Sequence, residues 1–141
     1  MEFRYVVTPH VIVKRLWDLY AWPELQLPMQ SMTVAKLLRY QRRPTYVSDL
    51  VRSRKQPSLA WDYGRIRFFY EQLLSGVTLD AIEVDNVCQG GRILPEPQVL
   101  DGHHRLAASH LAATEHIAVE YAGRLDLLRY LTGARASVPL K

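Results

Sequence analysis

A glycine turn between an apolar strand pattern and an alanine-rich helix pattern is the strongest constraint on the fold. The strand pattern ends at Asp101-Gly102, and the run from His103 to Ala112 has helical character. Glycine permits the tight turn, and the Asp101 side chain can cap the helix. Backbone N–H groups at such a helix start, with the Arg105 guanidinium one turn in, attract anions such as phosphate. An ordinary strand-to-helix turn without a ligand is the alternative.

Two adjacent histidines stand where a bound phosphate would lie. His103 and His104 can each donate a hydrogen bond to it or move a proton near neutral pH. The alternative is a structural role, with His104 bonding back toward Asp101. Asp101 is also the nearest carboxylate to contact a Mg²⁺ ion that arrives with a nucleotide. We expect His110 to pack, and we expect no metal site made by protein ligands alone.

The string from Val99 to Ala108, centred on Asp-Gly-His-His-Arg, resembles the phosphate-binding Gly-x-x-Arg motif of the ParB/sulfiredoxin superfamily. Similar helix and strand patterns flank it, so the resemblance covers residues 60–123. It implies a single compact α+β domain over residues 1–141, with a small mixed sheet flanked by helices. The expected additions are a variable N-terminal part (1–45) that contains a helix, and a C-terminal helix and tail (124–141).

Departures from the family motif narrow the implied chemistry. Sulfiredoxins have a catalytic cysteine directly after the glycine, where this chain has His103, so reduction of cysteine-sulfinic acid is not expected. The chromosome-partition members read Gly-Glu-Arg-Arg here, use cytidine triphosphate, and continue into a helix-turn-helix domain and a dimerisation domain. Because few residues follow the motif in this sequence, we do not expect a DNA-sliding clamp of that type. The Asp-Gly-His-His-Arg form is closer to standalone members that bind adenine nucleotides, among them free-serine kinases.

The resemblance therefore implies binding of ATP or a related nucleotide, with Mg²⁺, through Gly102, His103, His104 and Arg105. Asp101, His103 and His104 are then the catalytic candidates for phosphoryl transfer or nucleotide hydrolysis. The sequence leaves open whether the chain is an enzyme at all. Glu24, Asp62 and Glu71 are distant candidates for a base, and no pattern favours any of them.

The net charge of +4 and the pI near 9.4 fit a phosphate-bearing partner, either a nucleotide or nucleic acid. Basic residues interleaved with tyrosines gather in one stretch: Arg39, Arg42, Arg43, Arg52, Arg54 and Lys55. This pattern favours an alternative function, a phage- or plasmid-type regulatory protein that binds DNA or a host protein with little or no catalysis. A solvated surface is the other interpretation, because arginine outnumbers lysine throughout the chain.

Cysteine usage and hydropathy suggest a location. The lone Cys88 excludes an internal disulfide and fits a reducing compartment. No apolar run approaches the ~20 residues that cross a bilayer, and the N-terminus lacks a secretory pattern. We expect a cytoplasmic protein without a membrane partner, and the sequence does not set its oligomeric state.

Periodicity predicts the remaining elements. A helix is expected from Thr8-Pro9 to about Trp22, while residues 32–40 suit a helix and a strand equally. The best helix pattern spans 60–75 and has an apolar face of Ile66, Phe69, Tyr70, Leu73 and Leu74. The other expected elements are an extended segment at 24–30, a helix at 47–53, strands at 79–85, 92–94 and 117–121, and a helix at 124–132 with Leu125, Leu128 and Leu131 inward.

Overall fold

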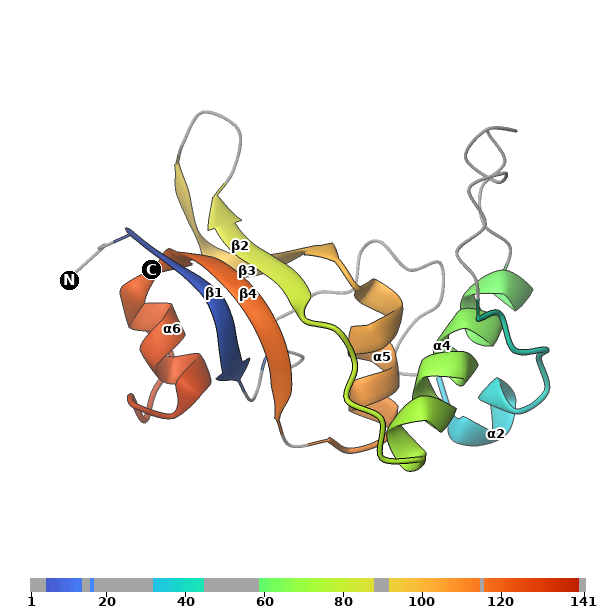
Figure 1. Cartoon of the computed structure of the whole chain (residues 1–141). Helices are drawn as coiled ribbons and strands as arrows, with labels where there is room; N and C mark the ends of the chain where they lie inside the picture. The colour runs from blue at the N-terminus through green and yellow to red at the C-terminus, as the bar shows by residue number, and fades with distance from the viewer. Residues whose placement is uncertain are drawn as a thin grey trace. The chain divides into compact units, whose positions relative to one another are not determined.

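The computed structural model describes residues 5–13, 16, 32–44, 59–87, 92–114 and 116–139. In these residues the chain is α+β, with a four-stranded mixed sheet and four helices (Figure 1). They form two compact units. We call them the sheet unit, which contains β1 to β4 and α6, and the helical unit, which contains α2, α4 and α5. The chain returns to the sheet unit at Asp80, passes to the helical unit after Gly102 and returns again at Thr114.

The sheet contains β1 (Tyr5–Val13), β2 (Ile82–Val87), β3 (Ile93–Asp101) and β4 (Ile117–Arg124), in the order β1-β4-β2-β3. Strand β4 is antiparallel to β1 and parallel to β2, and β2 is antiparallel to β3. Along β4 the burial alternates: Ile117, Val119 and Tyr121 are buried, and Glu120 is exposed. One face of the sheet therefore belongs to the core.

The N-terminal segment is a strand, so the predicted helix is wrong over residues 8–13. Residues 5–13 pair with β4, and the register shifts between Thr8 and Val11. The segment is rich in valine and isoleucine, which favour strands. Pro9 is tolerated because β1 is an edge strand and the irregularity falls at the proline. The rest of the predicted helix lies outside the described residues, apart from the buried Leu16.

The three predicted strands are confirmed with shifted ends. β2 begins three residues later than expected, and β4 extends three residues further, to Arg124. The short strand expected at 92–94 and the motif strand form one element, β3, which runs through Pro95 and Pro97. β3 is the other edge of the sheet, where a residue without an N–H removes no ladder hydrogen bond on its open side.

Helix α6 (Leu125–Thr132) is confirmed and packs beside β1 and β4. Its inward face differs from the prediction, because Leu127, Tyr130 and Leu131 are buried while Leu125 and Leu128 are only partly buried. Asp126, in the first turn of α6, is also buried, and it forms an ion pair with Arg124.

The helical unit contains α2 (Val34–Leu37), α4 (Leu59–Leu74) and α5 (His103–Leu111). Thr33 caps α2 by accepting a hydrogen bond from Lys36 N at 3.2 Å, which decides the ambiguous segment in favour of a helix. The core consists of Met32, Leu37, Tyr63, Ile66, Ala107 and Ala108. The two alanines allow α5 to approach α4 closely, and the element contacts are concentrated between these two helices.

The long helix is confirmed almost as predicted. Phe69, Tyr70 and Leu73 pack against the core, as expected from their spacing. Leu74 is 65% exposed, so its assignment to the apolar face is wrong. The helix ends at Leu74, and the chain turns away through Gly76 at φ 83°.

Several predictions lie outside the described residues: the segment 24–30, the helix at 47–53, Glu24 and Cys88. In the described part of the chain, no helix has the length and apolar character that crossing a membrane requires.

Candidate functional site

The predicted motif residues lie where a strand meets a helix. Asp101 is the last residue of β3 and is exposed, and His103 is the first residue of α5. Gly102 stands between them with φ 103°, a left-handed backbone conformation that favours glycine. Gly102, and not Asp101, therefore directly precedes the helix. Asp101 and Gly102 belong to the sheet unit, whereas His103, His104 and Arg105 belong to the helical unit.

In the helical unit, His104 forms a hydrogen bond with Asp62 of α4, with 2.8 Å between Nε2 and Oδ1. The Asp62 side chain is 5% exposed, and that of His104 is 21% exposed. The indole of Trp61 meets the imidazole edge-on at a centroid distance of 5.2 Å. Because a carboxylate only accepts, a neutral His104 holds its proton on Nε2 and keeps a lone pair on Nδ1.

The same two helices carry an arginine shortly after each member of this pair. Arg65 is one turn after Asp62 on α4, and Arg105 follows His104 on α5. The pKa of Arg65 is lowered, first by burial and then by the positive charge of Arg105. The positive charges of the two side chains therefore act on one another. We call Asp62, Arg65, His104 and Arg105 the α4–α5 polar site.

Arg65 is held in place by its other contacts. Its Nη1 donates to the carbonyl oxygens of Arg43 at 3.0 Å and Pro44 at 2.6 Å. The guanidinium lies 4.6 Å from the centroid of the Phe69 ring. These contacts fix the Arg65 side chain on α4, where the positive charge of Arg105 acts on it.

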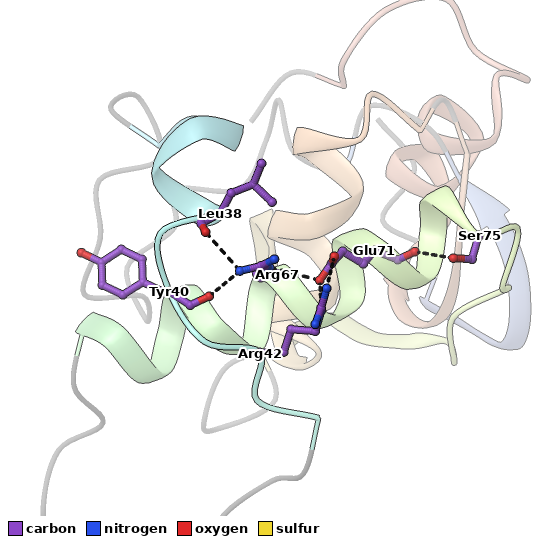
Figure 2. A network of polar contacts seen from close by, with 6 residues as sticks. All are labelled: Leu38, Tyr40, Arg42, Arg67, Glu71 and Ser75. Atoms are coloured by element: carbon purple, nitrogen blue, oxygen red, sulfur yellow. Dashed lines mark hydrogen bonds and ion pairs between the residues drawn. The ribbon is translucent and has the colours of Figure 1, made fainter.

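A network on the same helix anchors the segment that precedes α4 (Figure 2). Arg67 donates to the carbonyl oxygens of Leu38 at 3.1 Å and Tyr40 at 2.9 Å, and also to Glu71. Arg42 forms a bidentate ion pair with Glu71, with 2.9 Å between Nη2 and Oε2. The hydrogen bond from Arg42 is the largest influence on the Glu71 carboxyl, whose pKa is lowered despite partial burial.

Gly64 lets this segment lie directly on α4. A Cβ at this position would stand 2.1 Å from the Gln41 carbonyl oxygen and 2.7 Å from Arg43 Cγ. The Arg43 N–H donates to the Gly64 carbonyl at 3.0 Å, and the Tyr40 ring stacks on Tyr63 with centroids 4.5 Å apart. The segment 38–44 is therefore fixed by backbone contacts, stacking and ion pairs at once.

Three of the six residues that the sequence predicts to bind nucleic acid lie in the described part of the chain: Arg39, Arg42 and Arg43. Arg42 is paired with Glu71, and Arg43 contributes backbone groups to the contact with α4. Arg52, Arg54 and Lys55 lie outside the described residues. The interface with DNA stays a prediction, and the contacts of Arg42 give that side chain a structural role.

The sheet unit has its own buried polar cluster. Arg124 and Asp126 form a bidentate ion pair with distances of 3.0 and 2.8 Å, and Asp126 also accepts from Leu127 N. The Tyr121 hydroxyl donates to the Asn86 side chain and accepts from Arg124 N at 3.0 Å. Burial raises the pKa of Tyr121, so its hydroxyl stays protonated and can donate. This cluster is sealed in the core and joins strands to α6.

The sequence indicated Asp62 only as a distant candidate for a base, and it did not indicate Arg65. One signal was present: Asp62 lies four residues before Ile66, on the apolar stripe of the long helix. An acidic residue in that position is expected to be buried and paired. His104 is joined to Asp62 and not, by any described bond, to Asp101. His110 is exposed, so the prediction that it packs is wrong.

Comparison with protein-family models, with curated proteins and with solved structures gave no match for the chain. The likeness to the ParB/sulfiredoxin superfamily accordingly stays a prediction from the motif. Within the described residues, no three His, Cys, Asp or Glu side chains are grouped in a way that could hold a metal ion.

Proposed function

We infer that the α4–α5 polar site binds the phosphate groups of a nucleotide such as ATP. The supporting observation is the Asp62–His104 hydrogen bond between α4 and α5, the two helices that also carry Arg65 and Arg105. A buried carboxylate that orients a partly exposed histidine is a common arrangement for moving protons. Two cations held together favour an anion with several negative oxygens.

The donor set suits a phosphate group. Arg105 offers a planar fork of N–H donors, and His104 lies next to it in the first turn of α5. The positive end of the helix dipole favours the same negative charge. The Nε2 atom of His103, the first residue of α5, is buried, so its contact with the phosphate stays a prediction from the motif. Asp101 as a contact for nucleotide-bound Mg²⁺ stays a prediction, because it rests on the order of residues in the motif.

Phosphoryl transfer is the reaction that these side chains would serve. A bound nucleotide supplies the phosphoryl group. His104 Nδ1 has the lone pair to accept a proton from an attacking hydroxyl or water, and Asp62 stabilises the imidazolium that results. Arg105 stabilises the negative charge on the phosphate oxygens. Each role belongs to a described side chain of the helical unit.

Thermal unfolding with and without ATP, ADP and pyrophosphate, each with Mg²⁺, tests the binding step. At a nucleotide concentration about a hundred times Kd, the stabilisation should be about 2.7 kcal/mol. Arg105→Ala should remove most of this stabilisation. Arg129→Ala, an exposed arginine on α6, is the matched control and should retain it.

Turnover is tested separately from binding. His104→Gln and Asp62→Asn should slow release of phosphate from ATP, while leaving most of the thermal stabilisation by the nucleotide. No stabilisation by any of the three ligands would exclude a nucleotide site here. If DNA instead binds with a steep salt dependence that Arg39→Ala weakens, the regulatory alternative is correct.

A further inference from the structure

A second surface, on the sheet unit, has the opposite charge from the chain as a whole. The chain has a net charge of +4. Among the described side chains of the four strands, Glu83, Asp85, Asp101 and Glu120 are acidic and Arg124 is the only arginine or lysine. Arg124 is buried and paired with Asp126, so it contributes no exposed positive charge. The sheet is therefore an acidic region in a basic protein.

The register gathers three of these carboxylates, Glu83, Asp85 and Glu120, on one face of the sheet. Glu83 is the partner of Glu120 across the parallel pair of strands, and Asp85 is the partner of Ala122. On the other side of β4, Val7 is also the partner of Ala122. These positions alternate with the buried ones, Val84 and Val119 among them. The carboxylates and Val7 thus lie on the face opposite to the core.

This face is hollowed and partly apolar. An open hollow of about 340 Å³ is lined by Val7, Leu100 and Ala122 together with Glu83, Asp85 and Glu120. Val7 is 67% exposed and Leu100 is 57% exposed. We call these six residues the acidic face. Ile12, about half exposed, is the partner of Ala118, which lies on the same side of β4 as Ala122, and it extends the apolar surface along β1.

The acidic face has the features of a docking surface for a cationic, partly apolar chain. Like charges at paired positions of neighbouring strands, as with Glu83 and Glu120, destabilise a sheet, and a cation between them would relieve the repulsion. Lysine and arginine side chains lay their methylene stems on apolar surface while the charged end meets a carboxylate. Small-molecule sites enclose most of their ligand. This hollow is open and continues into exposed residues of β1, so it suits an extended chain better than a small molecule.

We propose that the acidic face binds a basic, amphipathic segment of a partner protein. A lysine or arginine of that segment lies between Glu83 and Glu120, and an apolar side chain of the segment covers Val7 and Leu100. The complementary charge and the exposed valine and leucine argue for this occupant. The acidic face lies wholly on the sheet unit, so this proposal does not depend on the nucleotide site of the helical unit.

The test uses the full chain and a short, fluorescently labelled peptide in which lysine alternates with leucine and alanine. Fluorescence anisotropy measures binding at about 50 and about 200 mM salt. We expect binding that weakens at the higher salt, because the contacts are ionic. The double variant Glu83→Gln and Glu120→Gln should weaken binding about tenfold. Val7→Ser should weaken it less, because it removes only apolar contact.

Two controls separate docking from non-specific charge attraction. Asp80→Asn changes an exposed carboxylate that does not line the hollow, and it should leave binding unchanged. A peptide with glutamate in place of lysine should not bind. The proposal is overturned if the lysine peptide fails to bind, or if it binds equally well to the double variant. It is also overturned if the Asp80 variant loses as much affinity as the double variant. Thermal unfolding of each variant checks that it is folded.

Discussion

Each unit contains a buried aspartate bound to a basic side chain, and the two pairs differ in what they leave exposed. Arg124 and Asp126 are both almost fully buried and are joined by two hydrogen bonds. Asp62 is equally buried, but His104 keeps 21% of its side chain exposed and uses one nitrogen. The first pair is closed to ligands. The second can reach a ligand while its ring is held, which is why we assign function to it.

The largest effect in this comparison should come from removing the two aspartates. Asp126→Ala leaves the Arg124 charge buried without its partner and should lower the free energy of unfolding by about 3–5 kcal/mol. Asp62→Ala should cost less, about 1–3 kcal/mol, because histidine can be neutral and His104 is partly hydrated. Urea unfolding of both variants measures the difference. Equal losses would mean that the Asp62–His104 pair is as structural as the other.

Disturbing the contact between the segment 38–44 and α4 should have the next largest effect. Gly64→Ala places a methyl group against the Gln41 carbonyl and should lower the free energy of unfolding by about 1–3 kcal/mol. Gly76→Ala is the control, because its Cβ would meet open space and only the backbone strain at φ 83° remains, about 1 kcal/mol. If Gly64→Ala lowers the free energy of unfolding no more than Gly76→Ala does, the segment 38–44 can move away from α4 at little energetic cost.

The sequence predicts most of the described helices and strands, but not β1. The long helix, α6 and the strands were predictable because their apolar residues recur at helical or alternating spacing. The strand β1 was not, because Thr8-Pro9 imitates a helix start. A bulge on an edge strand uses the same residues, and only pairing with β4, more than a hundred residues away, decides between them.

The candidate site was predictable only in part. The motif indicated His104 and Arg105, since both belong to the Gly-x-x-Arg string that begins at Gly102. Their partners Asp62 and Arg65 come from another helix, and no local pattern specifies which carboxylate a histidine meets 42 residues away. The position of Asp62 on an apolar stripe could have marked it as buried and paired. It could not have identified the partner.

Lowering the pH should remove the stabilisation that ionised Asp126 gives to the sheet unit through its pair with Arg124. Burial opposes ionisation of Asp126, but the hydrogen bonds from Arg124 and Leu127 and the Arg124 charge outweigh it, so its pKa is lowered from 3.8. The resulting stabilisation is complete above that ordinary value, and it is lost as pH falls through the lower folded value. The difference in unfolding free energy between wild type and Asp126→Asn should shrink over this range. A difference independent of pH would contradict the assignment.

The smallest effect should come from the Arg42–Glu71 ion pair of the helical unit. This pair is more exposed to solvent than Arg124–Asp126 and Asp62–His104. Arg42 holds the pKa of Glu71 below its ordinary value of 4.5, mainly through their hydrogen bond. Arg42→Ala should therefore raise the pKa of the Glu71 carboxyl toward that value, and the remaining contact with Arg67 should keep the rise incomplete. A carbon-detected NMR titration of Glu71 measures the change, with Arg39→Ala as the control. Stability should fall only slightly, because water and salt screen an exposed pair. An unchanged Glu71 pKa would mean that Arg42 is not held on α4 in solution, and its guanidinium would then be available to nucleic acid.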